Sequence, residues 1–138
     1  MTGPWLLDTN IVSETRKRRP APGVMSFLDG ATSSNLFISV LTIGELRKGV
    51  ETKRQDDAAL AGELGRWVDG LETLFADRIL PVDTPVAHLW GALSAGRSLP
   101  VIDTLIAATA LVHGLTVVTQ NGADMEATGV SLLNPWER

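Results

Sequence analysis

Two patterns of apolar residues alternate along the chain. Short unbroken apolar runs are typical of strands buried on both faces, and they predict strands over residues 5–7, 36–41, 79–82 and 115–119, with a fifth over 130–133 at the edge. Apolar residues at helical spacing predict helices over 21–31, 42–50, 56–75 and 101–112, and a further helix that opens at Thr84-Pro85. The helix over 101–112 is apolar nearly all round and should be central. Gly114 is well placed to end it.

This order of elements predicts an α/β fold. Continuous apolar strands separated by helices indicate a parallel β-sheet flanked by helices on both faces. The chain has 138 residues, which is long enough to bury a sizeable core, so we expect residues 1–138 to form a single domain. In such folds, ligand sites gather at the carboxyl ends of the strands.

Composition excludes several classes of protein. Hydrophobic residues make up 44% of the chain and charged residues 20%, which is ordinary for a globular protein and wrong for a disordered one. The absence of cysteine excludes disulfide scaffolds, thiolate zinc sites and cysteine nucleophiles. No apolar stretch approaches the roughly 20 residues of a membrane span, and the first one ends at Asp8 without a signal-peptide core. We therefore expect a cytoplasmic protein that does not engage membranes.

The net charge bears on nucleic-acid binding. It is −4, from 12 basic and 16 acidic residues, so a nucleic-acid partner requires positive charge from a bound cation, a basic loop or a partner chain. The densest basic run consists of Arg16, Lys17, Arg18 and Arg19. This run is either a patch that guides RNA phosphates or a solvated loop, and the sequence leaves both interpretations open.

Four carboxylates stand at or near the ends of predicted elements. Asp8 follows the first predicted strand, Glu45 lies one turn into the helix after the second, and Asp124 follows the fourth. Asp103 lies in the otherwise apolar helix over 101–112. If all four meet at one sheet edge, their repulsion raises their pKa values unless a cation neutralises them. Hard oxygen ligands of this kind select Mg²⁺ or Mn²⁺.

Each of these carboxylates also has a structural interpretation. Asp8 can cap the next helix, and Asp103 can occupy a helix first turn, where the dipole favours an anion. The run from Thr42 to Glu45 matches a capping box, in which Glu45 satisfies only a backbone amide. Asp124 can be a turn residue. Structural caps have no reason to recur at one sheet edge, however, so the combination favours a shared site.

Other polar and aromatic residues favour structural roles. Asp83 with Thr84-Pro85 is typical of a helix start. Trp67 and Trp90 lie on apolar helical faces, so we expect them in the core rather than as platforms for base stacking.

Four motifs follow one another at domain-scale spacing: Leu7-Asp8-Thr9-Asn10, Leu41-Thr42-Ile43-Gly44-Glu45-Leu46-Arg47-Lys48-Gly49, Ile102-Asp103-Thr104-Leu105-Ile106-Ala107-Ala108, and Val118-Thr119-Gln120-Asn121 with Asp124. With these motifs the chain resembles a PIN domain. More narrowly, it is similar to the VapC/FitB-type toxins of bacterial toxin–antitoxin pairs. The resemblance extends from Leu7 to the closing Leu133-Asn134-Pro135-Trp136.

The resemblance implies roles for individual residues. It implies a catalytic and metal-binding site made of the acidic residues Asp8, Glu45, Asp103 and Asp124. It also implies that three polar residues support this site, namely Thr9, Thr119 and Asn121. The chain departs from the family pattern at two positions. Gln120 stands where many relatives have arginine, which puts one RNA-backbone contact in doubt, and Met125 stands where they usually have phenylalanine.

The resemblance also implies an activity and partners. We expect a Mg²⁺- or Mn²⁺-dependent endoribonuclease that hydrolyses phosphodiester bonds of structured RNA, such as tRNA or rRNA. Asp8 and Asp103 are expected to bind the principal ion, and Glu45 and Asp124 to complete the site or orient water. The implied partners are a cognate VapB-type antitoxin, a second copy in a homodimer, and promoter DNA reached only through the antitoxin. The alternatives are a metal nuclease acting on DNA and a non-catalytic regulatory subunit.

Overall fold

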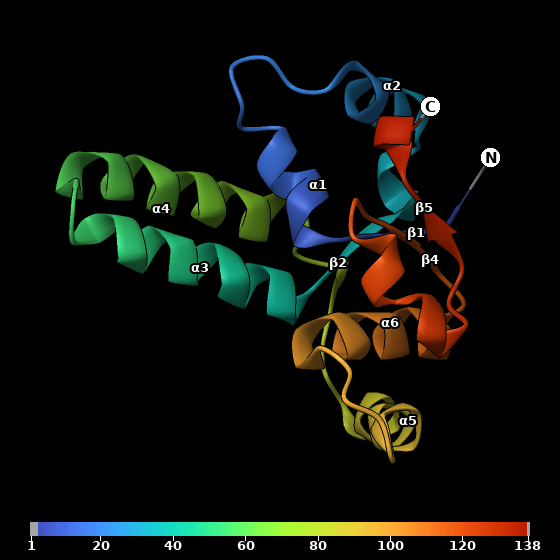
Figure 1. Ribbon diagram of the computed structural model, residues 1–138. Helices are drawn as coiled ribbons and strands as arrows, with labels where there is room; N and C mark the ends of the chain where they lie inside the picture. Colours follow the sequence, from blue (N-terminus) through green and yellow to red (C-terminus); the bar gives the residue numbers. More distant parts are fainter. Residues whose placement is uncertain (1–2, 138) are drawn as a thin grey trace.

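The strands form one parallel sheet. The computed structural model describes residues 3–137 (Figure 1). Within them the strands are β1 (Trp5–Leu7), β2 (Leu36–Ser39), β3 (Ile79–Leu80), β4 (Thr116–Val118) and β5 (Leu132–Leu133). Their order is β3-β2-β1-β4-β5, and every neighbouring pair is parallel. The predicted parallel α/β fold is thereby confirmed, with β1 at its centre.

Helices connect and cover the strands. The α-helices of the described residues are α1 (Thr9–Glu14), α2 (Pro22–Gly30), α3 (Val40–Arg54), α4 (Ala58–Leu74), α5 (Thr84–Ser94) and α6 (Val101–His113). Single-turn 3₁₀ helices are η1 (Ser33–Asn35), η2 (Gly122–Asp124), η3 (Glu126–Thr128) and η4 (Pro135–Glu137). None of the helices within residues 3–137 is long and apolar enough to cross a membrane.

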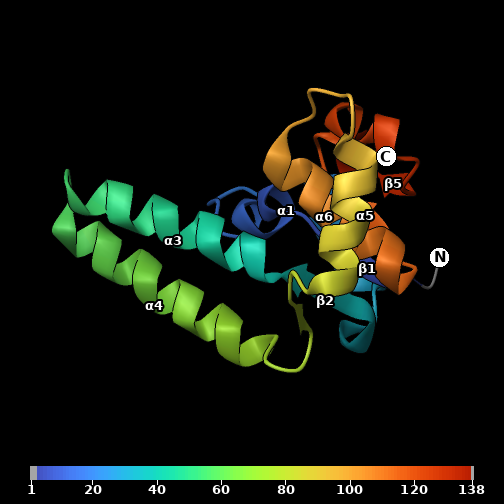
Figure 2. The ribbon, with the colours of Figure 1, turned by 90° about the horizontal axis from the view of Figure 1, so that it is seen from below.

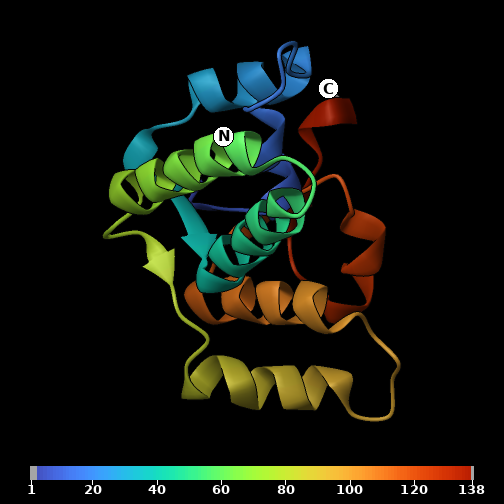
Figure 3. The ribbon, with the colours of Figure 1, turned by 90° about the vertical axis from the view of Figure 1, so that its left-hand side faces the viewer.

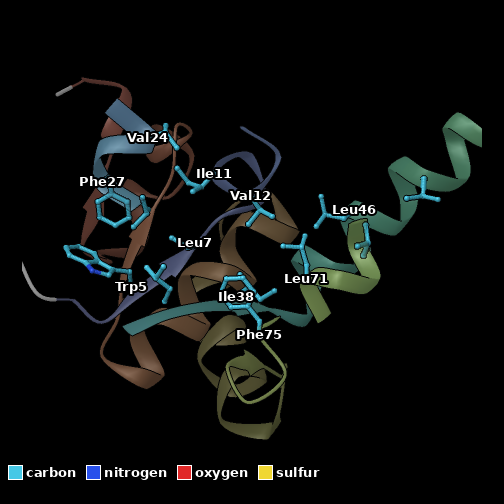
Figure 4. Close-up of a cluster of buried hydrophobic side chains, with 14 of the residues drawn as sticks. Trp5, Leu7, Ile11, Val12, Val24, Phe27, Ile38, Leu46, Leu71 and Phe75 are labelled. Atoms are coloured by element: carbon cyan, nitrogen blue, oxygen red, sulfur yellow. The ribbon is translucent and has the colours of Figure 1, made fainter. Parts of the chain in front are cut away.

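Alternation along β1 divides the core between the two faces of the sheet. Trp5 and Leu7 point to the face covered by α1 to α4, whereas Leu6 points to the face covered by α6. The first cluster joins the sheet to helices far apart in the sequence, and Figure 4 shows Phe27 of α2 and Leu71 of α4 within it. The rings of Trp5 and Phe27 meet edge to face, with centroids 5.1 Å apart. Helices therefore flank both faces, as predicted.

The helix α6 lies between the sheet and α5 (Figures 2 and 3). Its middle, from Ile106 to Ala110, is buried, which confirms the central position predicted for it. Its two ends still expose apolar side chains, including Val101 and Val112. Gly114 ends the helix with a φ of 67°, a left-handed conformation that glycine adopts without the steric penalty of a Cβ atom.

The boundary between β2 and α3 lies two residues earlier than the sequence predicts. The Ser39 hydroxyl accepts a hydrogen bond from the amide of Leu41 at 3.0 Å, so α3 begins at Val40. The predicted strand over 36–41 is therefore too long. The predicted helix over 42–50 is too short, because α3 continues to Arg54. The apolar run hides this boundary, since it continues unbroken across the cap.

Ion pairs connect α3 to α4. These two helices run side by side and project from the sheet (Figures 1 and 2). Arg47 on α3 forms salt bridges with Asp69 and Glu72 on α4 and donates to the carbonyl of Gly65 at 3.3 Å. Arg47 is thereby engaged in holding the pair of helices together.

Candidate active site

Asp8 occupies the junction between the central strand and α1. Its amide donates to the carbonyl of Val118 at 3.0 Å, which continues the β1–β4 pairing by one residue. Its carboxylate accepts from the amide of Thr9 at 2.8 Å, which caps α1, and from the hydroxyl of Thr119 at 2.7 Å. Asp8 is therefore a helix cap, as the structural interpretation predicts, but its second oxygen is held by Thr119, the residue that follows β4.

Burial governs the ionisation of Asp8. The residue is 3% exposed, and the loss of water raises the pKa of its carboxyl above the ordinary value. The hydrogen bonds from Thr119 and Thr9 oppose this rise, and the charge of Glu45 adds to it. Asp8 is thus a rigidly held carboxylate whose negative charge is poorly solvated.

Glu45 faces α1 from the first turns of α3. Its carboxylate accepts a hydrogen bond from the Thr9 hydroxyl, and the hydroxyls of Thr9 and Thr42 lie 3.2 Å apart. The capping-box interpretation of Glu45 is wrong, because α3 is capped by Ser39 and Thr42 lies inside the helix. Glu45 is instead an exposed side chain that is hydrogen-bonded to Thr9 at the start of α1.

Asp103 lies in the first turn of α6, as the helix-dipole interpretation allows. Desolvation raises the pKa of its carboxyl to about 6, and the charges of Asp8, Asp124 and Glu45 contribute to the rise. Within residues 3–137 its carboxylate accepts no hydrogen bond. All four predicted acidic residues therefore interact electrostatically around Asp103.

Three of these four carboxylates line one cavity of about 340 Å³, which we call the acidic cavity. The residues that line the acidic cavity are Asp8, Thr9, Asn10, Ser13, Glu45, Asp103 and Asn121. Asp124 is exposed in η2 and does not line the cavity, although its charge contributes to the raised pKa of Asp103. The ends of β1, β2 and β4 and the start of α6 thus meet at one edge, as the topology rule predicts.

Thr119 is the centre of a polar network beside this cavity. Its hydroxyl donates to Asp8 and accepts from the amide of Asn121 at 2.9 Å and from the side chain of Asn10 at 3.2 Å. The side-chain oxygen of Asn10 in turn accepts from the amide of Gln120 at 3.2 Å. The predicted supporting residues Thr119 and Asn121 therefore lie beside Asp8, and the network also includes Asn10.

Two residues of the acidic cavity were absent from the predicted site. Asn10 follows directly in the Asp-Thr-Asn motif, so its place beside Asp8 has a visible signal in the sequence. Ser13 lies four positions after Thr9 and therefore on the same face of α1, but this spacing alone indicates no site.

The two departures from the family pattern have different surroundings. Met125 is fully buried in the cluster under α6, so it keeps an apolar role at the position where relatives usually have phenylalanine. Gln120 is exposed, and its backbone amide contacts Asn10.

The acidic cavity suits a hard divalent cation. No three Asp, Glu or His side chains within residues 3–137 lie in a ready-made cage for an ion. Mg²⁺ does not require one, because it is bound by one or two carboxylates and keeps several waters. The donor set of Asp8, Glu45 and Asp103, with the amide oxygens of Asn10 and Asn121 nearby, consists of hard oxygen ligands only. These residues therefore fit the predicted ion.

The basic run follows α1 as an exposed segment. Glu14 holds this segment from within and from beyond its end, because its buried carboxylate pairs with Lys17 at 2.9 Å and accepts from the amide of Ala21 at 2.8 Å. The guanidinium of Arg16 lies 5.5 Å from the ring centroid of Trp67. Trp67 packs against the core cluster but is only half-buried, so only part of its surface belongs to the core that the sequence predicts for it.

Comparison with known proteins identifies the family. The family model described as PIN domain matches residues 5–130. Plasmid stability protein StbB from Pseudomonas syringae pv. tomato is 36% identical, with 96% of this chain and 98% of the relative covered. Toxin FitB from Neisseria gonorrhoeae is 35% identical (95% and 97% covered). VapC ribonuclease Y4jK from Sinorhizobium fredii is 34% identical (96% and 97% covered).

The fold agrees with these relatives. The crystal structure of FitAcB from Neisseria gonorrhoeae matches with a TM-score of 0.87 at 34% identity, covering 97% of this chain and 99% of that chain. The sequence motifs, the topology and the acidic edge therefore have one common explanation. The chain belongs to the PIN-domain family, among its VapC/FitB-type nuclease toxins, as the resemblance predicts.

Proposed function

We propose that the chain is a Mg²⁺- or Mn²⁺-dependent endoribonuclease, the toxin of a VapBC-type pair acting in the cytoplasm. The observation that carries this proposal is the convergence of Asp8, Glu45 and Asp103 in one cavity at the carboxyl edge of the sheet. Metal-assisted hydrolysis needs such carboxylates beside a space open to a phosphodiester. The VapC ribonuclease among the relatives supports RNA as the substrate.

The side chains of the acidic cavity have distinct roles in this proposal. A bound divalent ion would activate water and neutralise the charge that develops on the phosphate. Asp8 and Asp103 would hold the ion, and Thr119 keeps the carboxylate of Asp8 in one orientation through its hydrogen bond. Glu45 would orient the attacking water, because Thr9 fixes its carboxylate at the rim. Asp124 lies outside the cavity and adds its negative charge to the electrostatic potential at Asp103.

The partners follow from the relatives. The similarity to FitAcB supports a VapB-type antitoxin as the inhibitor, and we propose that promoter DNA is reached only through this antitoxin. Exposed apolar side chains on α6, including Val101 at 56% exposure, support a homodimer. Structured RNA such as tRNA or rRNA is the expected substrate.

The function is tested by incubating total cellular RNA with purified, antitoxin-free protein in Mg²⁺, in Mn²⁺ and in EDTA. We expect discrete fragments in either metal and none in EDTA. Asp8→Asn should lower cleavage on the order of 10³-fold, because it removes a ligand charge from the site. The fold should persist, since asparagine also caps helices. Cleavage by Asp8→Asn at the wild-type rate contradicts the proposal, and cleavage of matched DNA oligonucleotides alone favours a DNA nuclease.

The basic run is proposed to guide RNA phosphates to the acidic cavity. Its four side chains are exposed and follow the helix that carries Thr9 and Ser13. Replacement of Arg16, Lys17, Arg18 and Arg19 by glutamine should flatten the slope of log affinity against log salt concentration by up to about 3, since each phosphate contact to single-stranded RNA contributes roughly 0.7. An unchanged slope would show that the run is only a solvated loop.

A further inference from the structure

A second cavity, of about 260 Å³, lies between α1, α3 and α4, and we call it the interhelical cavity. The residues that line the interhelical cavity are Thr9, Ser13, Arg16, Glu45, Leu46, Gly49, Val50, Leu64, Trp67 and Val68. Its walls on α3 and α4 are apolar and include one aromatic ring, whereas its rim on α1 is polar. A flat apolar group with a polar edge would fit such a lining.

The interhelical cavity adjoins the acidic cavity. Thr9, Ser13 and Glu45 line both. Because Thr9 and Glu45 are hydrogen-bonded to each other, part of the boundary between the two cavities is fixed. A group in the interhelical cavity is therefore next to whatever occupies the acidic cavity.

The rim of the interhelical cavity carries the first residue of the basic run. The guanidinium of Arg16 lies over the Trp67 ring at 5.5 Å. A guanidinium in this position offers a planar, weakly hydrated surface and a positive charge, which together suit a nucleotide. In a chain with a net charge of −4, Arg16 offers a local positive charge to a polyanion.

Gly49 leaves the interhelical cavity open. A Cβ atom built at this position meets no atom within 4 Å. Gly49 lies inside α3 and has no left-handed conformation that would require glycine. Because Gly49 is exposed on α3 and lines the interhelical cavity, a large side chain at this position would narrow the opening of the cavity.

We propose that the interhelical cavity is a nucleobase subsite, in which a base of the RNA next to the scissile phosphate lies between α3 and α4 beside Trp67 and Arg16. The inference rests on the proposed function, because it takes the acidic cavity as the place of the scissile phosphate. It adds a determinant of which nucleotide is cut that the acidic residues cannot supply, since they act on the phosphodiester common to all nucleotides.

A base fits the observations better than a peptide side chain. The occupant must reach the cavity while the attached chain passes Arg16 and the acidic edge, and a sugar–phosphate backbone complements both the guanidinium and an ion-loaded acidic cavity. An apolar peptide side chain would pack against the apolar walls, but it would not interact with Arg16 or with an ion in the acidic cavity.

The test fills the cavity without removing any side chain. Gly49→Leu places an apolar group in the open space, and leucine favours a helix. Gly70→Leu is the matched control, because Gly70, like Gly49, is an exposed helical glycine whose Cβ would meet no atom of the described chain within 4 Å, but it does not line the cavity. Both changes are made in the Asp8→Asn background with Mg²⁺, and the affinity for a short fluorescent single-stranded oligoribonucleotide of mixed sequence is measured without cleavage.

We expect Gly49→Leu to weaken binding roughly 5- to 150-fold relative to Gly70→Leu, the range typical of one lost stacked base. With Gly49 intact, one abasic position in the oligonucleotide should weaken binding by a similar factor, and that same position should have no further effect in Gly49→Leu. Equal affinities of the two leucine variants, or the absence of any sensitive abasic position, would overturn the subsite. Failure of the proposed function is read separately, from wild-type protein that cuts no RNA.

Discussion

Asp8 and Asp103 line the same cavity but are held in different ways. Asp8 is 3% exposed and accepts hydrogen bonds from the Thr9 amide and the Thr119 hydroxyl. Asp103 is partly exposed, and within the described chain its carboxylate accepts none. Both carboxyls have raised pKa values, and desolvation is the largest cause in each.

The difference separates two tasks of an acidic site. Hydrogen bonds to Asp8 fix the position of its oxygens before any ion arrives, so this side of the site is preorganised. Asp103 is surrounded by the charges of Asp8, Asp124 and Glu45 without a donor of its own, so it gains most from a cation. In the proposed metal site, Asp8 therefore provides a fixed position for an ion, and Asp103 provides a negative charge that the ion would neutralise.

The largest effect on this contrast is expected from Thr119→Val, which removes the hydroxyl from Asp8 and keeps the shape of the side chain. The pKa of Asp8 should rise further, because this hydrogen bond lowers it. Loss of such an orienting partner typically weakens metal binding 10- to 100-fold, as calorimetric titration with Mg²⁺ would measure. Thr119→Ser keeps the hydroxyl and should bind Mg²⁺ nearly as wild type. Equal affinities of the valine and serine variants would show that Asp8 needs no preorganisation.

A smaller effect, with a sign that depends on metal, is expected from Asp103→Asn. In EDTA at pH 8 the variant should melt roughly 2–4 °C higher than wild type, because it relieves repulsion with Asp8, Asp124 and Glu45. In saturating Mg²⁺ the order should reverse, since wild type gains more from the ion. Thermal unfolding in the two buffers measures both signs. An unchanged melting temperature in EDTA would mean that the carboxylates are too well solvated to repel one another.

The smallest effect concerns Glu14, a buried carboxylate with partners. The hydrogen bond from Lys17 and that from the Ala21 amide hold its pKa below the ordinary value. Because the folded pKa is lowered, ionised Glu14 stabilises the protein at neutral pH, and this contribution is lost as the pH falls through the folded pKa. Glu14→Gln should therefore be less stable than wild type at pH 7, and the gap should narrow in acid. Urea unfolding at pH 7 and at successively lower pH measures the difference in the free energy of unfolding between the two proteins.

Glu51 provides the comparison for Glu14. Its pKa is also lowered, by Arg54, but the pair is exposed on α3 and satisfies no backbone amide. Glu51→Gln should therefore have a weaker effect at pH 7, since exposed ion pairs contribute little. If the two glutamine variants behave alike, Glu14 does not anchor the basic segment.

Most of the fold could be predicted because its signals are local. The cap at Asp83 and the left-handed Gly114 mark the start of α5 and the end of α6, and both occur where the sequence places them. The boundary at Ser39 could not be found in this way. The apolar run continues through Val40 and Leu41, and only the hydrogen bond of the Ser39 hydroxyl distinguishes strand from helix.

The convergence of the carboxylates could be predicted from the sequence, but their surroundings could not. The rule that sites form at strand ends brings Asp8 and Glu45 together from segments 37 residues apart, and the structure shows both in one cavity with Asp103. No comparable rule predicts the contact between Arg16 and Trp67 from the sequence, because this contact depends on how the segment after α1 packs against α4. The interhelical cavity is therefore visible only in three dimensions.

The central place of β1 has a consequence for synthesis of the protein on the ribosome. The strand pairs with β4, so Trp5 meets Thr116 across nearly the whole length of the chain. A nascent polypeptide that ends before Thr116 already contains Asp8, Glu45 and Asp103, but it lacks the strand and the Thr119 hydroxyl that fix Asp8. Since long-range pairing of this kind forms late, the acidic cavity takes its final form only after the residues up to Thr119 have been synthesised, rather than gradually as each carboxylate is added.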